Sequence, residues 1–425
     1  MLRRAGLGCG LALAGLPAWP SPGAVRAAAG LKRSRSDDHF LDELERSAVL
    51  YFWEAADPMT GLVKDRSRAD GPDPRVIGSI AATGFGLTAL CIADKRGYLP
   101  RGNLRRRVAQ TLRFLWDQLP HEHGFFFHFI NVRNGERIWN CELSSIDTAL
   151  LLCGVLTCRQ HFADREIRRM AAQIYERVDW PWMLDGADTF SHGWYPERGF
   201  IRNRWDEYCE LMMIYLLAIG SSTHPVAASC WEAWKRPWFE YEDLRYINPK
   251  APLFIHQYSH AWFDFRGRRD RHADYFKNSV QATRAHLRFC LGLRARFPHF
   301  SEQLWGITAS DSAKGYLAWG GPPEQGLLDG TVVPCAAGGS IPFLPEECLR
   351  TLRAMRERFG GQAWKRYGFI DAFNPATNWF NPDVIGIDLG ITLLMAENAR
   401  SGFVWQTFME NEEARRGMAQ AGFVR

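Results

Sequence analysis

Three carboxylates stand at the start of apolar helical segments, where a charge without a partner is costly to bury. Asp147 follows a pair of serines that suit a helix N-cap, and an apolar run comes after it. Glu210 is followed by a run of apolar residues, and Asp388 opens a third apolar segment. Carboxylates in such positions are candidates for acid–base chemistry.

The chemistry depends on whether these segments are neighbouring helices. If all three belong to one inner ring, their N-terminal ends meet at one rim, and Glu210 faces Asp388 across it. A buried Glu210 has a raised pKa, as a general acid requires. An acid and a carboxylate on either side of a sugar bond are what glycoside hydrolysis needs, and their separation decides between inversion and retention.

Structural alternatives stay open at each position. Asp147 in a first helical turn also fits a residue that only stabilises the helix dipole. Glu210 also fits a buried carboxylate paired with an arginine. Asp206 and Glu207, just before it, are interpreted as helix caps.

Helical periodicity dominates the chain that must position these residues. Apolar helical runs alternate with loops rich in Gly, Pro and aromatic residues, without strand–helix–strand alternation. A short aromatic segment, 125–132, is expected to pair as a hairpin. The candidate helices are 38–56, 77–96, 104–118, 145–162, 166–178, 204–219, 272–297, 345–359 and 389–400.

These helices are of two kinds. Segments 104–118 and 272–297 are amphipathic, whereas 146–157 and 211–219 are apolar nearly all round. Outer amphipathic helices around inner buried ones predict an all-α fold, an (α/α)6 barrel. An irregular α-solenoid is the alternative, although the chain has no fixed repeat period.

The first 29 residues have the order of a secretory signal: a basic head, an apolar stretch and an alanine-rich end. We therefore predict export to the periplasm or the medium, and a single catalytic domain over residues 36–425. Loss of Arg3, Arg4 and Arg26 lowers the net charge from +5 to about +2. Neither nucleic acid nor stable membrane insertion is expected; the predicted partner is a neutral glucan or oligosaccharide, bound by a monomer.

Loop aromatic residues support a sugar ligand, because aromatic faces beside hydrogen-bonding groups suit a neutral saccharide. They stand in loops or at helix starts, often beside Gly, Asp, Arg or His, and are Trp194, Tyr195, Trp205, Tyr208, Trp262, Trp305, Trp319 and Trp379.

No cofactor or metal is predicted. His256 and His260 have the spacing of a zinc-binding helix, but Gln257 stands where a catalytic glutamate is needed, and a third ligand is not evident. Nine cysteines remain after signal cleavage, without a CxxC pair, and pairing of Cys335 with Cys348 stays open.

Several segments, in the same order along the chain, resemble the glycoamylase-like domain of bacterial β-1,2-glucanases. They are WDEYCE (205–210), GSSTHP (220–225), HQYSHAWFDFR (256–266), WGITASD (305–311), DGTVVP (329–334), YGFIDAFN (367–374) and the stretch from Asp388 to ENARSG (397–402). The resemblance implies an (α/α)6 barrel without a metal that cleaves β-1,2-glucan or its oligosaccharides with inversion. It places the acidic site positions at Glu210 and Asp388.

On this basis we assign Glu210 as general acid and Asp388 as the base that activates water. A first-turn Asp388 is expected to have a lowered pKa, as a base requires. The chain departs from the family at Asp147, where Glu is expected, and at Ala399, where Tyr is common. The predicted substrate-binding residues are Glu142, Asp147, Trp194, Arg204, Trp205, Tyr208, His256, Gln257, His260, Trp262, Asp264, Trp305, Asp311, Asp371, Asn374, Trp379 and Arg400.

Two other functions remain as alternatives. A polysaccharide lyase on a helical toroid needs basic residues to hold an acidic sugar, and Arg204, Arg266 and Arg400 are available. A non-catalytic glycan-binding envelope protein would bind sugar and leave it intact.

Overall fold

Six helices that are apolar on nearly every side form an inner ring. In the computed structural model, which describes residues 34–425, most residues of these helices are buried. A helix without a polar face must be enclosed by other elements, because exposing it forfeits hydrophobic free energy. The inner helices are α2 (Ile80–Arg96), α4 (Ser145–His161), α7 (Met212–Ile219), α8 (Tyr258–Trp262), α10 (Pro334–Gly338) and α12 (Gly386–Ser401).

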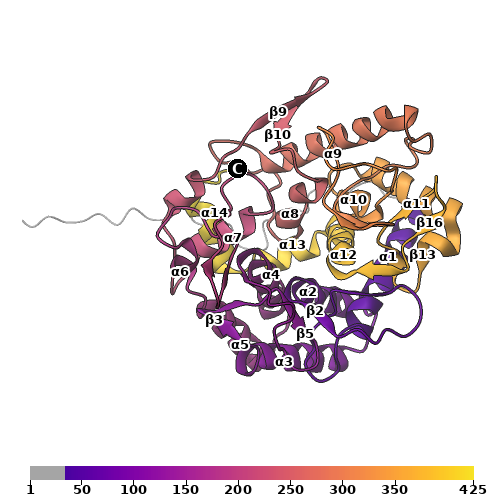
Figure 1. Cartoon of the computed structure of the whole chain (residues 1–425). Coiled ribbons are helices and arrows are strands. Elements are labelled where there is room, and N and C mark those ends of the chain that lie inside the picture. The colour runs from indigo at the N-terminus through magenta and orange to yellow at the C-terminus, as the bar shows by residue number, and fades with distance from the viewer. Residues whose placement is uncertain (1–33) are drawn as a thin grey trace, which may run out of the picture.

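Six amphipathic helices cover this ring: α1 (Arg35–Glu54), α3 (Arg101–Asp117), α5 (Arg165–Glu176), α9 (Tyr275–Gly292), α11 (Pro345–Ala363) and α14 (Glu412–Gln420). In α5, for example, Ile167, Met170 and Ile174 are buried, while Arg168 and Arg169 are exposed. Figure 1 shows α3, α5 and α9 on the periphery and α4, α8 and α12 closer to the centre. The predicted all-α, (α/α)6 barrel is confirmed.

Helices α2 and α4 approach so closely that glycine is required at their contact. A Cβ atom on Gly154 would lie 2.1 Å from the backbone oxygen of Gly84, and one on Gly84 would lie 2.4 Å from the backbone oxygen of Leu150. Backbone atoms cannot move away as a flexible side chain can. The two helices, of which α4 carries Asp147, are therefore held at a fixed separation.

Replacing Gly154 by alanine is expected to destabilise the protein by ~1–3 kcal/mol or more, because the added methyl group must force the two backbones apart. Thermal unfolding followed by circular dichroism measures the effect. Gly102→Ala is the matched control: Gly102 is also helical, nothing lies within 4 Å of the position that a Cβ atom would take there, and alanine is expected to be neutral or stabilising. Equal melting temperatures for the two variants would contradict the close contact.

Short strands tie the N-terminal ends of the inner helices together. Strand β2 (Ile77–Ser79) leads into α2 and pairs with β5 (Phe129–Asn131), whereas β17 (Asp383–Ile385) leads into α12 and pairs with β1 (Arg66–Arg68). Lys64, just before β1, forms a bridge with Gly78 of β2. The N-terminal ends of α2 and α12 are thereby brought to the same rim.

The same arrangement holds for α4. Strand β6 (Leu143–Ser144) leads into it and pairs with β7 (Gly193–Tyr195), which pairs with β8 (Gly199–Phe200). The remaining strands are β3 (His121–Glu122), β4 (Phe125–Phe126), β9 (Trp238–Tyr241), β10 (Leu244–Ile247), β11 (Ser310–Ser312), β12 (Gly315–Leu317), β13 (Trp364–Lys365), β14 (Gly368–Phe369), β15 (Phe373–Asn374) and β16 (Trp379–Phe380).

Two predicted elements were wrong. Helix α7 begins at Met212, not at residue 204, because the preceding segment bonds to its neighbours: Trp205 N–H donates to the Phe190 carbonyl and Tyr208 N–H to that of Lys235. The segment 125–132 is not a hairpin, since β4 pairs with β3 and β5 pairs with β2.

Four short helices were not predicted, because their few residues show no helical period: α6 (Trp180–Leu184), α8, α10 and α13 (Phe403–Phe408). The amphipathic α14 and the 3₁₀ turns η2 (Ala228–Glu232) and η3 (Leu253–His256) were not predicted either, whereas η4 (Leu293–Ala295) lies within the predicted segment 272–297. Within residues 34–425, no helix is long and apolar enough to cross a bilayer. All nine cysteines of this part of the chain are free thiols, Cys335 and Cys348 included. The predicted signal, 1–29, lies outside the described residues.

Candidate active site

The three carboxylates singled out from the sequence lie at the N-terminal ends of inner helices. Asp147 is in the first turn of α4, where Ser144 caps the helix and donates to its carboxylate at 2.5 Å. Glu210 lies in the turn before α7, and Asp388 is in the first turn of α12. The sequence had suggested that Glu210 lies inside a helix, but it lies in the turn before one.

Glu210 combines access with a low-polarity environment. Its side chain keeps part of its surface accessible, yet the surrounding protein removes most of its hydration. Burial raises the pKa of Glu210 to about 7, and the charge of Asp147 acts in the same direction. A carboxyl group that retains a proton near neutral pH suits a general acid.

Asp388 belongs to a network of carboxyl groups on the other side of the site. It accepts a hydrogen bond from the Cys335 thiol and shares one with Asp371. Asp371 accepts hydrogen bonds from Asp311 N at 2.8 Å and from Asn381 Nδ2 at 3.1 Å. This network fixes the orientation of Asp371 directly and that of Asp388 through it.

Asp311 anchors the network to the only cation that contacts it among the described residues. Arg66 Nη1 donates to both oxygens of Asp311, at 2.9 and 2.8 Å, and Arg66 Nε donates to Asp65 at 3.0 Å. Asn381 donates to Asp311 at 3.0 Å. One arginine is thus paired with two carboxylates and cannot also neutralise the pair formed by Asp371 and Asp388.

The pKa predicted for Asp388 was wrong in direction. Burial raises the pKa of Asp388 to about 6, with further upward contributions from Asp65 and Asp311, and the hydrogen bonds from Asp371 and Cys335 only partly offset this. The helix N-terminus favours the anion by a few tenths to about one kcal/mol. Burial among other carboxyl groups outweighs that effect.

Tyr258 connects the two sides of the site. Its side chain, 6% exposed, packs at the start of α8. Burial raises the pKa of the Tyr258 phenol, and both Asp388 and Glu210 contribute to the shift through their charges. The charges of both carboxyl groups therefore act on one phenol.

A charged histidine stands beside Asp147. His128 Nδ1 lies 2.9 Å from Glu142 Oε1, and His128 Nε2 lies 3.6 Å from Asp147 Oδ2. Burial lowers the pKa of His128, but the two carboxylates outweigh it and bring the value to about 9. The imidazolium balances part of the negative charge on the Glu210 side.

Several aromatic rings of the predicted site remain partly accessible. Trp194 and Trp379 are half-buried, and Trp205 donates through Nε1 to Ser145 at the start of α4, at 2.8 Å. Tyr316 of β12 is 51% exposed, yet its phenol is near enough to Asp388 for that charge to raise its pKa. These rings offer flat apolar faces next to charged groups, as saccharide recognition requires.

Seven predicted substrate-binding side chains are enclosed by protein, and their contact with a ligand stays a prediction. Trp262 is in the core, where Nε1 donates to Thr88 Oγ1 at 3.0 Å. Burial lowers the pKa of His256 and His260 to about 3, so both are neutral core histidines. The seven, none more than 3% exposed, are Tyr208, His256, Gln257, His260, Trp262, Trp305 and Asn374.

Three more predicted contacts lie elsewhere. Arg400 is in the last turn of α12, about 18 Å along the helix from the carboxylate at its start. Asp264 follows the C-terminal end of α8 and pairs with Arg266, whose guanidinium lies over Trp405 next to that same far end of α12. Arg204 donates to two backbone carbonyl groups and fixes a loop.

Eight of the predicted site residues are thus linked at the N-terminal ends of the inner helices: Glu142, Asp147, Trp194, Trp205, Glu210, Asp311, Asp371 and Asp388. The structure adds seven residues that the sequence analysis did not find. They are single polar or aromatic residues in loops, short strands or short helices, without a pattern to reveal them: Asp65, Arg66, His128, Tyr258, Tyr316, Cys335 and Asn381.

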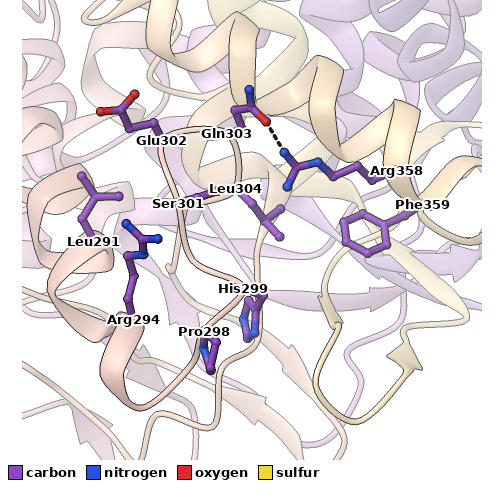
Figure 2. Close-up of a pocket in the computed structure, with 10 residues that line it drawn as sticks. All are labelled: Leu291, Arg294, Pro298, His299, Ser301, Glu302, Gln303, Leu304, Arg358 and Phe359. Atoms are coloured by element: carbon purple, nitrogen blue, oxygen red, sulfur yellow. Dashed lines mark hydrogen bonds between the residues drawn. The ribbon is translucent and has the colours of Figure 1, made fainter.

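A large cavity lies apart from these carboxylates. Its volume is about 650 Å³, and it is lined by Leu291, Arg294, residues 298–299 and 301–304, Arg358 and Phe359. Figure 2 shows Arg358 reaching across to Gln303, to which it is hydrogen-bonded. None of the acidic residues described above lines it. A much smaller cavity lies at Asp371, Asp388 and Cys335.

Comparisons with known proteins give relatives that cover nearly all of the described chain. Residues 202–412 match the protein family described as "Putative glucoamylase". A protein of the same description from Bacteroides uniformis is 30% identical, with a TM-score of 0.86 over 92% of this chain and 99% of that one.

Two relatives have more specific names. An endo-β-1,2-glucanase from Chitinophaga pinensis, solved with sophorotriose and glucose, is 26% identical, with a TM-score of 0.84 over 92% of this chain and 99% of that one. An exo β-1,2-glucooligosaccharide sophorohydrolase from Parabacteroides distasonis is 26% identical over 90% of this chain. The chain spans 58% of the length of that second relative.

Proposed function

Because the chain belongs to the glycoamylase family, we propose that it is a glycoside hydrolase that cleaves β-1,2-linked glucan or its oligosaccharides. The names of the Chitinophaga and Parabacteroides relatives support the linkage. The approximately neutral charge expected for the exported chain is in keeping with a neutral polymer.

The observation that carries the proposal is the position of Glu210 just before α7 and of Asp388 in the first turn of α12, each with a raised pKa and each acting on the Tyr258 phenol through its charge. In the proposed reaction Glu210 gives its proton to the leaving glycosidic oxygen. Asp388 removes a proton from the water that attacks the sugar carbon, and the product has inverted configuration. Partly exposed Trp194, Trp205 and Tyr316 would stack on glucose rings.

Product analysis tests the reaction. The protein is incubated with linear β-1,2-glucan and, in parallel, with starch and with β-1,3- and β-1,4-glucans. Sophorose or short β-1,2-oligosaccharides from the first substrate alone are expected. Release of glucose from starch would instead favour the activity that the family description suggests. New ultraviolet absorbance would identify a lyase, and binding without any cleavage would identify a glycan-binding protein.

Activity is expected to follow a narrow bell-shaped pH profile with its maximum between about pH 6 and pH 7. Asp388, whose pKa is about 6, must be ionised, so activity rises as pH increases through that value. Glu210, whose pKa is about 7, must be protonated, so activity falls as pH increases further. The dependence of kcat/KM on pH reports both groups in the free enzyme. A broad plateau extending to pH 9 would contradict the assignment of Glu210.

We also propose that the protein is exported and acts as a single catalytic domain. The basic head and apolar stretch of residues 1–29 support export. Fractionation of cells that express the full chain, followed by sequencing of the N-terminus, tests both the compartment and cleavage near residues 27–29.

A further inference from the structure

Asp371 and Asp388 are too close and too buried for both to be ionised. They are 3% and 8% exposed, and their side chains lie within hydrogen-bonding reach of each other. Asp371 Oδ1 and Asp388 Oδ2 are both buried, and neither meets a hydrogen-bond donor in the described chain. Two orphaned oxygens on adjacent carboxyl groups are satisfied together by a single proton between them.

The surroundings do not supply the positive charge that two carboxylates would need. The titratable and charged groups that face the pair are Asp65, Arg66, Tyr258, Asp311, Tyr316 and Cys335. Only Arg66 is a cation, and it is already paired with Asp65 and Asp311. Like charges buried without compensation take up a proton.

We propose that Asp371 and Asp388 share one proton. Asp371 Oδ1 carries it and donates a hydrogen bond through it to Asp388, so that Asp371 is a positioning residue for the base. This inference rests on the proposed function of Asp388. Asp371 is better placed to hold the proton, because its Oδ2 already accepts hydrogen bonds from Asp311 N and Asn381 Nδ2. Its Oδ1 is therefore the oxygen that is free to carry the proton. Asp388 is the more favourable of the two to be ionised, since it also accepts a hydrogen bond from the Cys335 thiol and stands at a helix N-terminus.

The direction of the pKa shift of Asp371 agrees with this assignment. Burial raises the pKa of Asp371 well above its ordinary value, and the charge of Asp388 acts in the same direction. The pair titrates as one unit in two steps. At neutral pH the state with a single proton gives a neutral donor at Asp371 and an ionised base at Asp388.

Two substitutions separate the roles. Asp371→Asn imitates the protonated acid: its amide still donates to Asp388 and its oxygen still accepts from Asp311 N. We expect kcat within about tenfold of wild type and an unchanged rising limb of the pH profile. Asp371→Ala removes the donor, so the rising limb is expected to move up by about one pH unit, with a larger loss of kcat. An Asp371→Asn variant as inactive as Asp388→Asn would overturn the assignment.

Infrared spectroscopy of the intact protein tests the proton without any substrate. The difference spectrum of wild type minus Asp371→Asn at neutral pH should show a protonated-carboxyl stretching band, because Glu210, which also keeps a proton near this pH, contributes to both spectra and cancels. Asp383→Asn is the matched control, because the Asp383 carboxylate is paired with Arg75 at 2.6 Å and its loss should leave the band unchanged. A difference spectrum without that band overturns the inference. A band that behaves as expected in a protein that cleaves no glucan overturns only the proposed function.

Discussion

Replacing Glu210 by glutamine is expected to lower kcat on β-1,2-glucan by ~10³-fold, the typical contribution of a general acid. The amide has the same shape but cannot supply a proton to the leaving oxygen. Because burial favours the neutral form of this residue, the substitution preserves the charge that the site has at neutral pH. Folding and substrate binding are therefore expected to remain, and the loss should be in kcat, with little change in KM.

The choice of leaving group sharpens this test. An aryl β-sophoroside with an acidic phenol departs without protonation, so Glu210→Gln should lose much less activity on it than on glucan. The falling limb of the pH profile should also disappear. Glu207→Gln is the matched control, since Glu207 is exposed on the same segment, and its activity should match wild type. Glucan turnover by Glu210→Gln within threefold of wild type would remove Glu210 from the mechanism.

Asp388→Asn is expected to produce a loss of similar size, ~10³-fold in kcat, because an amide cannot accept the proton of the attacking water. The substitution keeps the side chain at the start of α12 and within reach of Cys335 and Asp371. Calorimetry with β-1,2-oligosaccharides should show that binding is retained. Asp383→Asn, in the strand just before α12, removes a carboxylate outside the site and should leave turnover within severalfold of wild type.

The stereochemistry of the product decides what Asp388 does. If it activates water, polarimetry of the wild-type reaction should show products that start with inverted configuration and then mutarotate. Products that start with retained configuration would mean that a carboxylate attacks the sugar directly. That result would leave Asp388 essential but would exclude its role as a base toward water.

Segments with a clear helical period were predictable, and so was the pair of acidic residues at their ends. Helices α4 and α12 begin close to where their apolar runs begin, because burying a whole helix demands apolar residues on every face. Helices α8 and α10, with five residues each, carry no periodic signal, although they complete the inner ring. The burial of the aromatic residues was not predictable, because a tryptophan such as Trp262 looks the same in sequence whether it lines a site or fills the core.

The fold class and the candidacy of Glu210 and Asp388 could be inferred from the order of residues, since both follow from which residues can be buried. The electrostatics of the two carboxyl groups required the folded structure. The pKa of Asp388 depends on Asp65, Asp311 and Asp371, of which Asp65 and Asp311 come from distant parts of the chain. Electrostatic interaction depends on distance in space and on local burial, neither of which the order of residues specifies. The helix end alone predicted a lowered pKa for Asp388, and the residues that folding brings together raise it instead.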